Sequence, residues 1–194
     1  SEVLPTYNVA GLLESVSAKV RGAGTATPIV DSIAYDEKGR RTKITYSDTT
    51  GEHFYTEYTY DELTFRLAHF KTTRTSDDKL LQSLAYYYDA VGNITQTVDT
   101  ATQDVYFAAT PSPATADADY TYDAVYRLIE ASGREHGGQL GAPQHDEVQV
   151  DPYTAIPHGN NPNGLREYTQ EYAYDTVGNI ATMTHIATSA GWTR

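Results

Sequence analysis

Histidine and carboxylate side chains gather in the C-terminal half of the chain, and these residue types bind metal ions and transfer protons. The group consists of Glu135, His136, His145, Asp146, Glu147, Asp151 and His158. Its spacing fits neither the His pairs of zinc sites nor the ligand positions of an EF-hand loop. We therefore predict a solvated or structural loop here, with no metal ion and no cofactor. A metal-dependent hydrolase is the weakest of three functional hypotheses.

Two further arrangements could support hydrolysis, but neither has the surroundings that the chemistry needs. Asp117 and Asp119 could act as paired carboxylates, yet both precede a predicted turn. A glycosidase needs one of its two acids in a pocket that raises the pKa. Ser132 lies outside any G-x-S-x-G elbow. We predict that the chain is not an enzyme and that the stretch Arg134-Glu135-His136 forms an ion pair within the chain.

Tyrosine rings could bind a carbohydrate by stacking on the sugar. The chain has 17 Tyr against 4 Phe and 1 Trp. Rows of tyrosines alternate along predicted strands, at Tyr58, Tyr60, Tyr86, Tyr88, Tyr120, Tyr122, Tyr172 and Tyr174. Packing of aromatic pairs across neighbouring strands also explains such rows, at about 0.2–1 kcal/mol for each pair. We favour packing and keep a carbohydrate-binding or adhesive cell-surface module as the alternative function.

A repeated segment positions these side chains, and residues 86–94, YYYDAVGNI, are its clearest copy. This copy contains a strand that ends in Tyr88, a turn begun by Asp89, the glycine Gly92 and a new strand from Ile94. The other copies are marked by Tyr35, Asp36 and Gly39, by Tyr60 and Asp61, by Tyr122 and Asp123, and by Tyr174, Asp175 and Gly178. Copies of one strand-turn-strand unit indicate a repeat protein.

Each copy has the chemistry of a tight turn. An Asp carboxylate accepts hydrogen bonds from backbone N–H groups just ahead of it, and Gly enters the positive-φ region at little cost. Asn93 and Asn179 each follow the Gly of their copy. The Asp61 and Asp123 copies lack this Gly, so we predict that their turns either are of a different type or rely on the Asp alone. The repeated aspartates are therefore assigned to turns and not to catalysis.

Between the turns, residues alternate with the period of two that marks a β-strand. The segment 53–60, for example, places Phe54, Thr56, Tyr58 and Tyr60 on one side. The pattern predicts an all-β fold of consecutive antiparallel β-hairpins, and the fixed hand of strand twist predicts a strongly curved sheet. Residues 1–194 form a single repeat region, which an irregular insertion at 132–165, rich in Gly and Pro, interrupts. Near the start, residues 7–21 predict a strand pair with a turn near Gly11, and residues 22–28 predict a loop.

The composition argues against several classes of partner. A net charge of −12 and a pI near 4.7 argue against nucleic acids and anionic membranes, which require a basic surface. No apolar run is long enough to span a membrane, and the absence of Cys excludes disulfides and thiolate metal sites. The chain begins without Met, and we expect it to be a piece of a longer polypeptide. Such a piece has open sheet edges, which favour self-association.

The repeated turns resemble those of the YD-repeat family, also called the RHS-repeat family, whose signature is a Tyr-Asp-x-x-Gly strand and turn. The resemblance covers residues from roughly position 30 to the end of the chain. It is carried by segments similar to the repeat region of bacterial toxin-complex B components and related insecticidal toxin proteins: YTYDELTFRLAHFKTTR, YYYDAVGNITQTVDTATQDVYF, YTYDAVYRLIEASGREH and YAYDTVGNIATMTHIATSAGWTR.

This resemblance implies a segment of a spiral β-shell, whose strands carry no catalytic residues and which encloses a toxic polypeptide until delivery. The family's self-cleaving segment has paired Asp-Pro motifs, whereas this chain has the single pair Asp151-Pro152, so we assign no cleavage to it. We expect a non-enzymatic shell segment, secreted or at the cell surface. Its expected partners are the remainder of the parent toxin shell and the enclosed toxic polypeptide.

Overall fold

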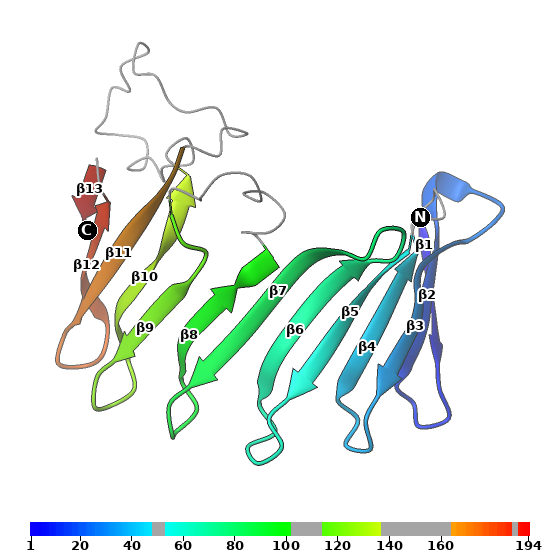
Figure 1. Cartoon of the computed structure of the whole chain (residues 1–194), viewed down its shortest axis with the longest axis horizontal. Helices are drawn as coiled ribbons and strands as arrows, with labels where there is room; N and C mark the ends of the chain where they lie inside the picture. The colour runs from blue at the N-terminus through cyan, green and yellow to red at the C-terminus, as the bar shows by residue number, and fades with distance from the viewer. Residues whose placement is uncertain (48–52, 102–113, 137–163, 188–189) are drawn as a thin grey trace, which may run out of the picture. The chain divides into compact units, whose positions relative to one another are not determined.

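The computed structural model describes residues 1–47, 53–101, 114–136, 164–187 and 190–194. This part of the chain contains thirteen β-strands, β1 to β13, and one short 3-10 helix, η1 (Val20–Gly22). The strands follow one another in the sheet in their sequence order, and neighbouring strands run antiparallel (Figure 1). This arrangement confirms the predicted all-β fold of consecutive antiparallel hairpins.

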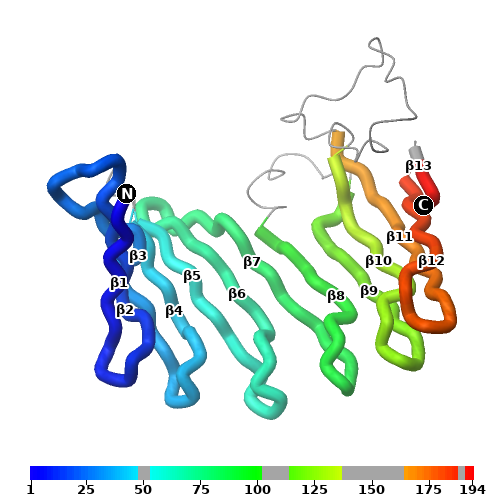
Figure 2. Tube along the Cα trace, turned by 180° about the vertical axis from the view of Figure 1, so that it is seen from behind, coloured from blue at the N-terminus to red at the C-terminus, as the bar shows by residue number. Residues whose placement is uncertain are grey.

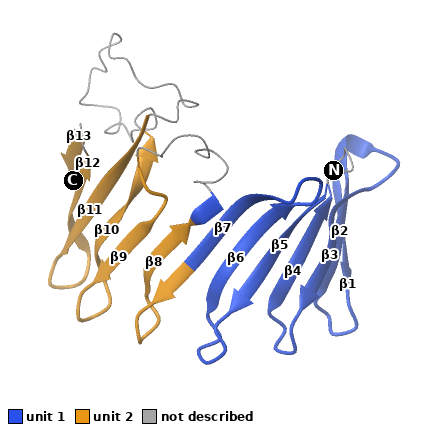
Figure 3. Cartoon of the chain, viewed as in Figure 1, with its two compact units in different colours: residues 1–85, 100–105 blue, residues 86–99, 106–194 orange. Residues whose placement is uncertain are grey.

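The chain divides into two compact units, which Figure 3 distinguishes by colour. The first unit comprises residues 1–85 and 100–105, and the second comprises residues 86–99 and 106–194. Strand β7 (Lys79–Tyr88) crosses the division, with residues 79–85 in the first unit and residues 86–88 in the second.

In the first unit, three hairpins follow one another, and β7 comes after the third. Their turns lie at the same end of the strands, as the tube in Figure 2 shows. The strands are β1 (Glu2–Tyr7), β2 (Leu13–Lys19), β3 (Thr27–Tyr35), β4 (Arg41–Ser47), β5 (His53–Tyr60) and β6 (Leu67–Arg74). The predicted strand pair at the start is confirmed, with Gly11 in its turn at a φ of 77°. Strand β3 begins at Thr27, so the last two residues of the predicted loop at 22–28 belong to a strand.

The second unit continues the pattern from the end of β7. Its strands are β8 (Ile94–Asp99), β9 (Ala118–Tyr122), β10 (Leu128–His136), β11 (Leu165–Tyr174), β12 (Ile180–Ala187) and β13 (Ala190–Thr193). The alternation of residues does not predict β13, because four residues are too few to show a period of two.

Strand β10 extends into the segment expected to be irregular. Residues 132–136 are paired with β11, and residues 137–163 lie outside the described residues. Gly133, which weakens a strand pattern, lies directly opposite Tyr168. A Cβ atom at Gly133 would lie 3.1 Å from the Tyr168 hydroxyl oxygen, so the ring of Tyr168 covers the glycine. The Tyr168 ring therefore packs over Gly133 across the two strands, although glycine by itself disfavours a strand.

The two faces of the first unit carry different side chains. On one face, Tyr46 stacks on Phe54 with 4.9 Å between ring centroids. On the other, the ammonium groups of Lys43 and Lys71 lie 3.9 and 3.2 Å from the carboxylate of Glu57. Among the described residues no large side chain is fully buried. Cross-strand pairs, and not a deep core, therefore hold neighbouring strands together.

Candidate functional site

The repeated Tyr-Asp turns share one backbone hydrogen-bond pattern. At Asp89, the backbone N–H donates to the carbonyl oxygen of Asn93 at 3.0 Å, and the Asp89 carbonyl accepts from Gly92 at 3.2 Å. The turns at Asp36, Asp123 and Asp175 have the same two bonds at the same spacing. Asp61 differs by one residue, since its N–H donates to Arg66 and its carbonyl accepts from Phe65. All five turns are therefore closed by the aspartate backbone.

The aspartate carboxylate fills the inside of each turn. Oδ1 of Asp89 accepts from the backbone N–H groups of Val91, Gly92 and Asn93 at 2.7–3.0 Å. Oδ2 accepts from the side-chain amide of Asn93 at 2.8 Å. One side chain thus satisfies backbone donors that would otherwise need water, which is the role of an Asx-turn.

In four of the five Tyr-Asp turns, the residue four positions after the aspartate donates to Oδ2, and the repeated Asn of the sequence pattern accounts for two of these four donors. Asn93 and Asn179 do so through their amides. Arg40 and Arg127 occupy the same position and donate through Nε at 2.7 Å to Asp36 and Asp123. Arg and Asn are different residue types, but the side chain of each places an N–H group within hydrogen-bond distance of Oδ2.

The glycine position of the turn accepts other residues. Gly39, Gly92 and Gly178 have φ of 76°, 113° and 94°. Tyr126 occupies this position in the Asp123 turn at a φ of 66° and makes the same backbone bond. At Asp123 the turn is therefore of the same type as in the glycine copies and relies on the aspartate, whose hydrogen bonds hold Tyr126 in the left-handed region despite its steric cost. For Asp61 the longer loop agrees with the prediction of a different type of turn, with Phe65 at a φ of 61°.

A sixth turn of this kind lies near the start of the chain, with Asn in place of Asp. The N–H of Asn8 donates to the carbonyl of Leu12, and Gly11 donates to the carbonyl of Asn8, both at 2.9 Å. Oδ1 of Asn8 accepts from the N–H groups of Ala10 and Leu12 at 3.0 Å. A search for Tyr-Asp pairs misses the sequence Tyr7-Asn8. The side-chain oxygen, which Asn and Asp share, is what the turn requires.

Tyrosine hydroxyls connect four of the five Tyr-Asp turns to the turn before each of them. Each acceptor is the backbone carbonyl of the first residue in the strand that leaves the preceding turn. The pairs are Tyr35 to Leu13 at 2.7 Å, Tyr60 to Arg41 at 2.9 Å, Tyr122 to Ile94 at 2.9 Å and Tyr174 to Leu128 at 2.7 Å. Neutral hydrogen bonds of this kind contribute about 0.5–1.5 kcal/mol each. Consecutive turns are thus joined within each unit.

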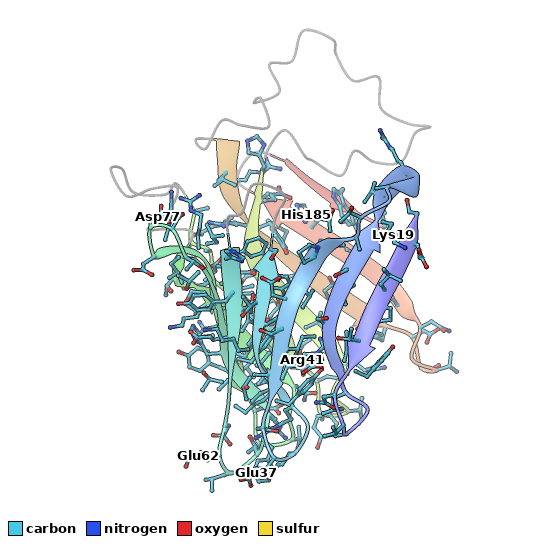
Figure 4. All side chains as sticks on the ribbon, turned by 90° about the vertical axis from the view of Figure 1, so that its right-hand side faces the viewer. Lys19, Glu37, Arg41, Glu62, Asp77 and His185 are labelled. Carbon is cyan, nitrogen blue, oxygen red and sulfur yellow. The ribbon has the colours of Figure 1, made fainter. Side chains whose placement is uncertain are left out.

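The arginines add a second connection between consecutive turns. The guanidinium carbon of Arg40 lies 4.3 Å from the ring centroid of Tyr60, and Nη1 donates to the carbonyl of Phe65 at 3.2 Å. In the second unit, the guanidinium of Arg127 lies 4.5 Å from the ring centroid of Tyr174. Each arginine therefore holds the aspartate of its own turn and the aromatic ring of the next. In Figure 4, Glu37 and Glu62 mark two neighbouring turns at one end of the first unit, with Lys19 and Asp77 toward the other end.

The pKa of the carboxyl is lowered at all five Tyr-Asp turns. At Asp175 the main cause is the side-chain hydrogen bond from Asn179, which stabilises the charged form. At Asp89, loss of water raises the pKa, but the hydrogen bonds, first among them that of the Asn93 side chain, outweigh this effect. A base that accepts protons near neutral pH has a raised pKa, so the shift argues for turn stabilisation and not for proton transfer.

A separate polar cluster lies on β10, β11 and β12 of the second unit. Arg166 Nη2 lies 2.6 Å from Glu135 Oε1, and His185 Nε2 lies 3.1 Å from Glu135 Oε2. The ring of His185 is stacked between Tyr168 and Trp192, with centroids 5.2 and 5.3 Å away. The ion pair predicted for the stretch Arg134-Glu135-His136 is confirmed at Glu135. It joins the strands on either side of residues 137–163.

The arrangements that could support catalysis do not assemble in the described residues. His69 Nε2 lies 3.0 Å from Ser83 Oγ, but Ser83 is buried and no carboxylate holds His69. Asp119 is hydrogen-bonded to Gln96 and Ser132, as a strand residue. No group of three or more His, Asp or Glu side chains that could hold a metal occurs in the part of the chain that the structure describes. The candidates His145, Asp146, Glu147, Asp151 and His158 lie outside the described residues.

The described residues contain no helix of the length and apolar character that crossing a membrane requires.

Comparison with known proteins connects the chain to bacterial toxin complexes. It is 30% identical over 185 residues to the toxin subunit YenC2 of Yersinia entomophaga, and 29% identical over 188 residues to the toxin subunit YenC1 of the same organism. These alignments cover 93% and 95% of this chain but 18% of each relative. The chain therefore spans less than a fifth of the length of the curated relatives it matches. No family model matches the sequence.

Solved structures give the same result. The crystal structure of TcdB2-TccC3-Cdc42 matches 98% of this chain with a TM-score of 0.70 and 30% identity, over 8% of the length of that chain. The Photorhabdus luminescens Tc holotoxin pore matches 98% of this chain with a TM-score of 0.76 and 30% identity, over 8% of that chain. The chain is homologous to these toxin proteins, which confirms the resemblance to YD-repeat toxin-complex components. The homology supports its assignment as a structural segment of a toxin complex.

Proposed function

Since the chain is homologous to the toxin subunits YenC2 and YenC1, we propose that it forms part of the wall of an RHS-repeat β-shell that encloses a toxic polypeptide. The segment performs no catalysis of its own. It acts within a secreted toxin complex. Its partners are the remainder of the parent shell and the enclosed polypeptide.

The observation that carries this proposal is the connection of four Tyr-Asp turns to the turn before each of them. In the second unit, Tyr122 donates to Ile94 and Tyr174 donates to Leu128, so each of these two hairpins is held by its predecessor. A closed wall needs hairpins that stay side by side without a second layer of structure. The turn links support this arrangement, because at the turn end of these hairpins they add hydrogen bonds to those between the strands.

The use of the aspartates supports a structural role. The carboxylates of Asp123 and Asp175 each accept hydrogen bonds within their own turn. Acids that act together in catalysis converge on one pocket. Here each acid serves one turn, so the repeat builds a wall and not an active site.

The aromatic rows do not favour the carbohydrate-binding alternative. Tyr46 stacks on Phe54, and Tyr58 stacks on Phe70 with 5.9 Å between centroids. These rings pack against each other, as cross-strand pairs do. A glycan array probed with the chain checks the alternative, and binding that disappears in Tyr58→Ala would support it against the shell.

The experiment that tests the proposal uses the parent toxin polypeptide and measures how fast a protease degrades the enclosed polypeptide. Asp175→Ala removes the acceptor of the Val177 and Asn179 N–H groups and loosens one turn of the wall. Thr176→Ala is the matched control, because Thr176 is exposed and adjacent. We expect the enclosed polypeptide to be degraded faster in Asp175→Ala and at the wild-type rate in Thr176→Ala.

A result that contradicts the proposal is equally clear. If the polypeptide is digested at the same rate with and without the intact shell, the chain does not enclose it. Hydrolase activity of the purified chain that is lost in a turn-aspartate variant would also overturn the non-enzymatic role.

A further inference from the structure

Strands β10 and β11 pair without a break although a long stretch of chain separates them. Seven consecutive pairs run from Glu130 with Glu171 to His136 with Leu165, and no shift of register interrupts them. A tight turn would fix such a register by its own geometry, but residues 137–164 lie between the two strands in sequence. The register of this pair therefore needs another source.

The ion pair of Glu135 and Arg166 can specify the register. The two residues lie directly opposite each other, and Arg166 Nε donates to Glu135 Oε1 at 2.7 Å. Their side chains are only 19% and 12% exposed. A slip by one residue would turn one of these side chains to the opposite face of the sheet. Since a largely buried charge is costly without its partner, the observed register is the one that satisfies both groups.

His185 connects the same carboxylate to a third strand. Its Nε2 lies 3.1 Å from Glu135 Oε2, and β11 lies between β10 and β12 in the sheet. The ring is stacked between Tyr168 and Trp192, and His185 is only 5% exposed. Gln170, directly opposite His185, places its Nε2 3.3 Å from Nδ1 of the ring. One carboxylate thus aligns three strands.

The other end of these strands is fixed by the Asp175 turn. This turn joins β11 to β12, and the hydroxyl of Tyr174 donates to the carbonyl of Leu128, the first residue of β10. Glu135 lies near the last residue of β10. Contacts at both ends of β10 therefore align it with β11 and β12.

We propose that Glu135, Arg166 and His185 form a clamp that sets the register of β10 and β11 without any contribution from residues 137–163. The second unit then keeps its structure when this segment is replaced or is cut by a protease, because the clamp and the strand pairing remain. This inference goes beyond the proposed function, since it holds whether or not the wall encloses a polypeptide.

Replacement of the segment gives the first test. A Gly-Ser stretch of equal length in place of residues 138–162 keeps the loop length and removes any specific contact of the native residues. We expect the midpoint of urea unfolding of the chain to be unchanged. A lower midpoint would mean that the native segment contributes to the pairing, and it would overturn the inference.

Cleavage of the segment is the sharper test. Residues 137–163 contain no Lys or Arg, so trypsin does not cut there, and a recognition sequence for a site-specific protease is inserted between Val150 and Asp151. After the cut, Glu135 lies on one fragment and its two partners lie on the other. We expect the two fragments to elute as one particle in size-exclusion chromatography at micromolar concentration.

Three variants of the cut chain separate the clamp from general destabilisation. Glu135→Ala leaves a buried guanidinium without compensation and should weaken the association of the fragments roughly 100-fold. His185→Phe keeps a ring in the aromatic stack but removes Nε2, and it should weaken the association about 10-fold. Glu130→Ala is the matched control, because Glu130 is exposed on the same strand opposite the like charge of Glu171. It should not weaken the association.

Two results of the cleavage experiment would overturn the inference. One is the separation of the wild-type fragments during elution. The other is a Glu135→Ala or His185→Phe chain whose fragments associate as tightly as those of the wild type. If Glu135→Ala gives no β-type circular dichroism spectrum before cleavage, His185→Phe decides. Shielding of the enclosed polypeptide from protease is measured separately, so failure of this inference leaves the proposed function standing.

Discussion

The hydroxyl of Tyr174 donates to the backbone carbonyl of Leu128 at 2.7 Å, across 46 positions of sequence. Leu128 begins the strand that leaves the Asp123 turn, and Tyr174 ends the strand that enters the Asp175 turn. Two turns that are far apart in the chain are thereby joined directly. The same type of bond joins Tyr122 to Ile94 in this unit.

Removal of this hydroxyl should weaken the second unit. We expect Tyr174→Phe to lower the free energy of unfolding by about 0.5–1.5 kcal/mol, because the carbonyl of Leu128 loses its donor while the ring remains. Urea unfolding followed by circular dichroism measures the change. Tyr87→Phe is the control, since Tyr87 is 53% exposed and its hydroxyl makes no hydrogen bond among the described residues. Equal unfolding midpoints for the two variants would show that the Tyr174 bond carries no stability.

The turn side chain should tolerate Asn better than Ala. Asp36 accepts from the N–H groups of Lys38 and Arg40 through Oδ1, as Asn8 does in its own turn. Asp36→Asn keeps this acceptor and loses the charge opposite Arg40, whereas Asp36→Ala loses both. We expect the thermal midpoint to fall in the order wild type, Asp36→Asn, Asp36→Ala.

The exposed neighbour Glu37 provides the control for this series. Glu37→Ala should leave the midpoint unchanged. An Asp36→Asn variant as unstable as Asp36→Ala would mean that charge, and not the Oδ1 acceptor, holds the turn.

Much of this site follows from sequence, and what does not has a physical reason. The Tyr-Asp pairs locate the turns because an Asx-turn is local. The Asn8 turn escapes a search for Asp because Asn offers the same side-chain oxygen, and Tyr126 escapes a search for Gly because hydrogen bonds hold it in the left-handed region. The link from Tyr174 to Leu128 cannot be read from sequence at all, since its acceptor is a backbone group in a distant strand.

Acid should destabilise the fold through the aspartates with lowered pKa. Asp77 has its pKa lowered from 3.8 to about 2, chiefly by the side-chain hydrogen bond from Arg74. The unfolded chain binds the proton more tightly than the folded chain, so the contribution of Asp77 is present above pH 3.8 and is lost as pH falls toward 2. We expect the free energy of unfolding to fall over this range.

Variants at two adjacent positions separate this effect from general acid denaturation. Asp77→Asn removes the titrating group, so its stability should depend less steeply on pH between 4 and 2 than that of the wild type. Asp78→Asn serves as the control, because Asn tolerates the positive φ of 53° found there. If the stability of Asp77→Asn depends on pH as that of the wild type does, the hydrogen bond from Arg74 does not lower the pKa of Asp77.

Glycine should be better than tyrosine at position 126. Tyr126 has a φ of 66° and is 58% exposed, so it bears the steric cost of the left-handed region with little packing in return. This cost is roughly 1–2 kcal/mol. Glycine avoids it, but glycine also gives the unfolded chain more conformational freedom, which offsets part of the gain in stability. We expect Tyr126→Gly to raise the free energy of unfolding by about 0.5–1 kcal/mol.

The reverse substitution at the equivalent position checks the same idea. A Cβ atom at Gly178 would meet no atom within 4 Å, so Gly178→Ala changes backbone strain alone. It should lower stability by about 1 kcal/mol, in keeping with the φ of 94°. Tyr126→Ala keeps the Cβ and removes the ring, and a gain equal to that of Tyr126→Gly would assign the effect to the ring instead.

The two glutamates of β10 should behave oppositely when they are replaced. The side chains of Glu135 and Arg166 are only 19% and 12% exposed, and Glu135 also faces His185. Removal of one partner from a largely buried ion pair leaves the other charge without compensation, so we expect Glu135→Ala to cost about 3 kcal/mol. Glu130 is exposed and lies directly opposite Glu171, a like charge. Glu130→Ala should be neutral or slightly stabilising in the same urea unfolding measurement. An equal loss of stability in both variants would mean that the buried ion pair of Glu135 is not the cause.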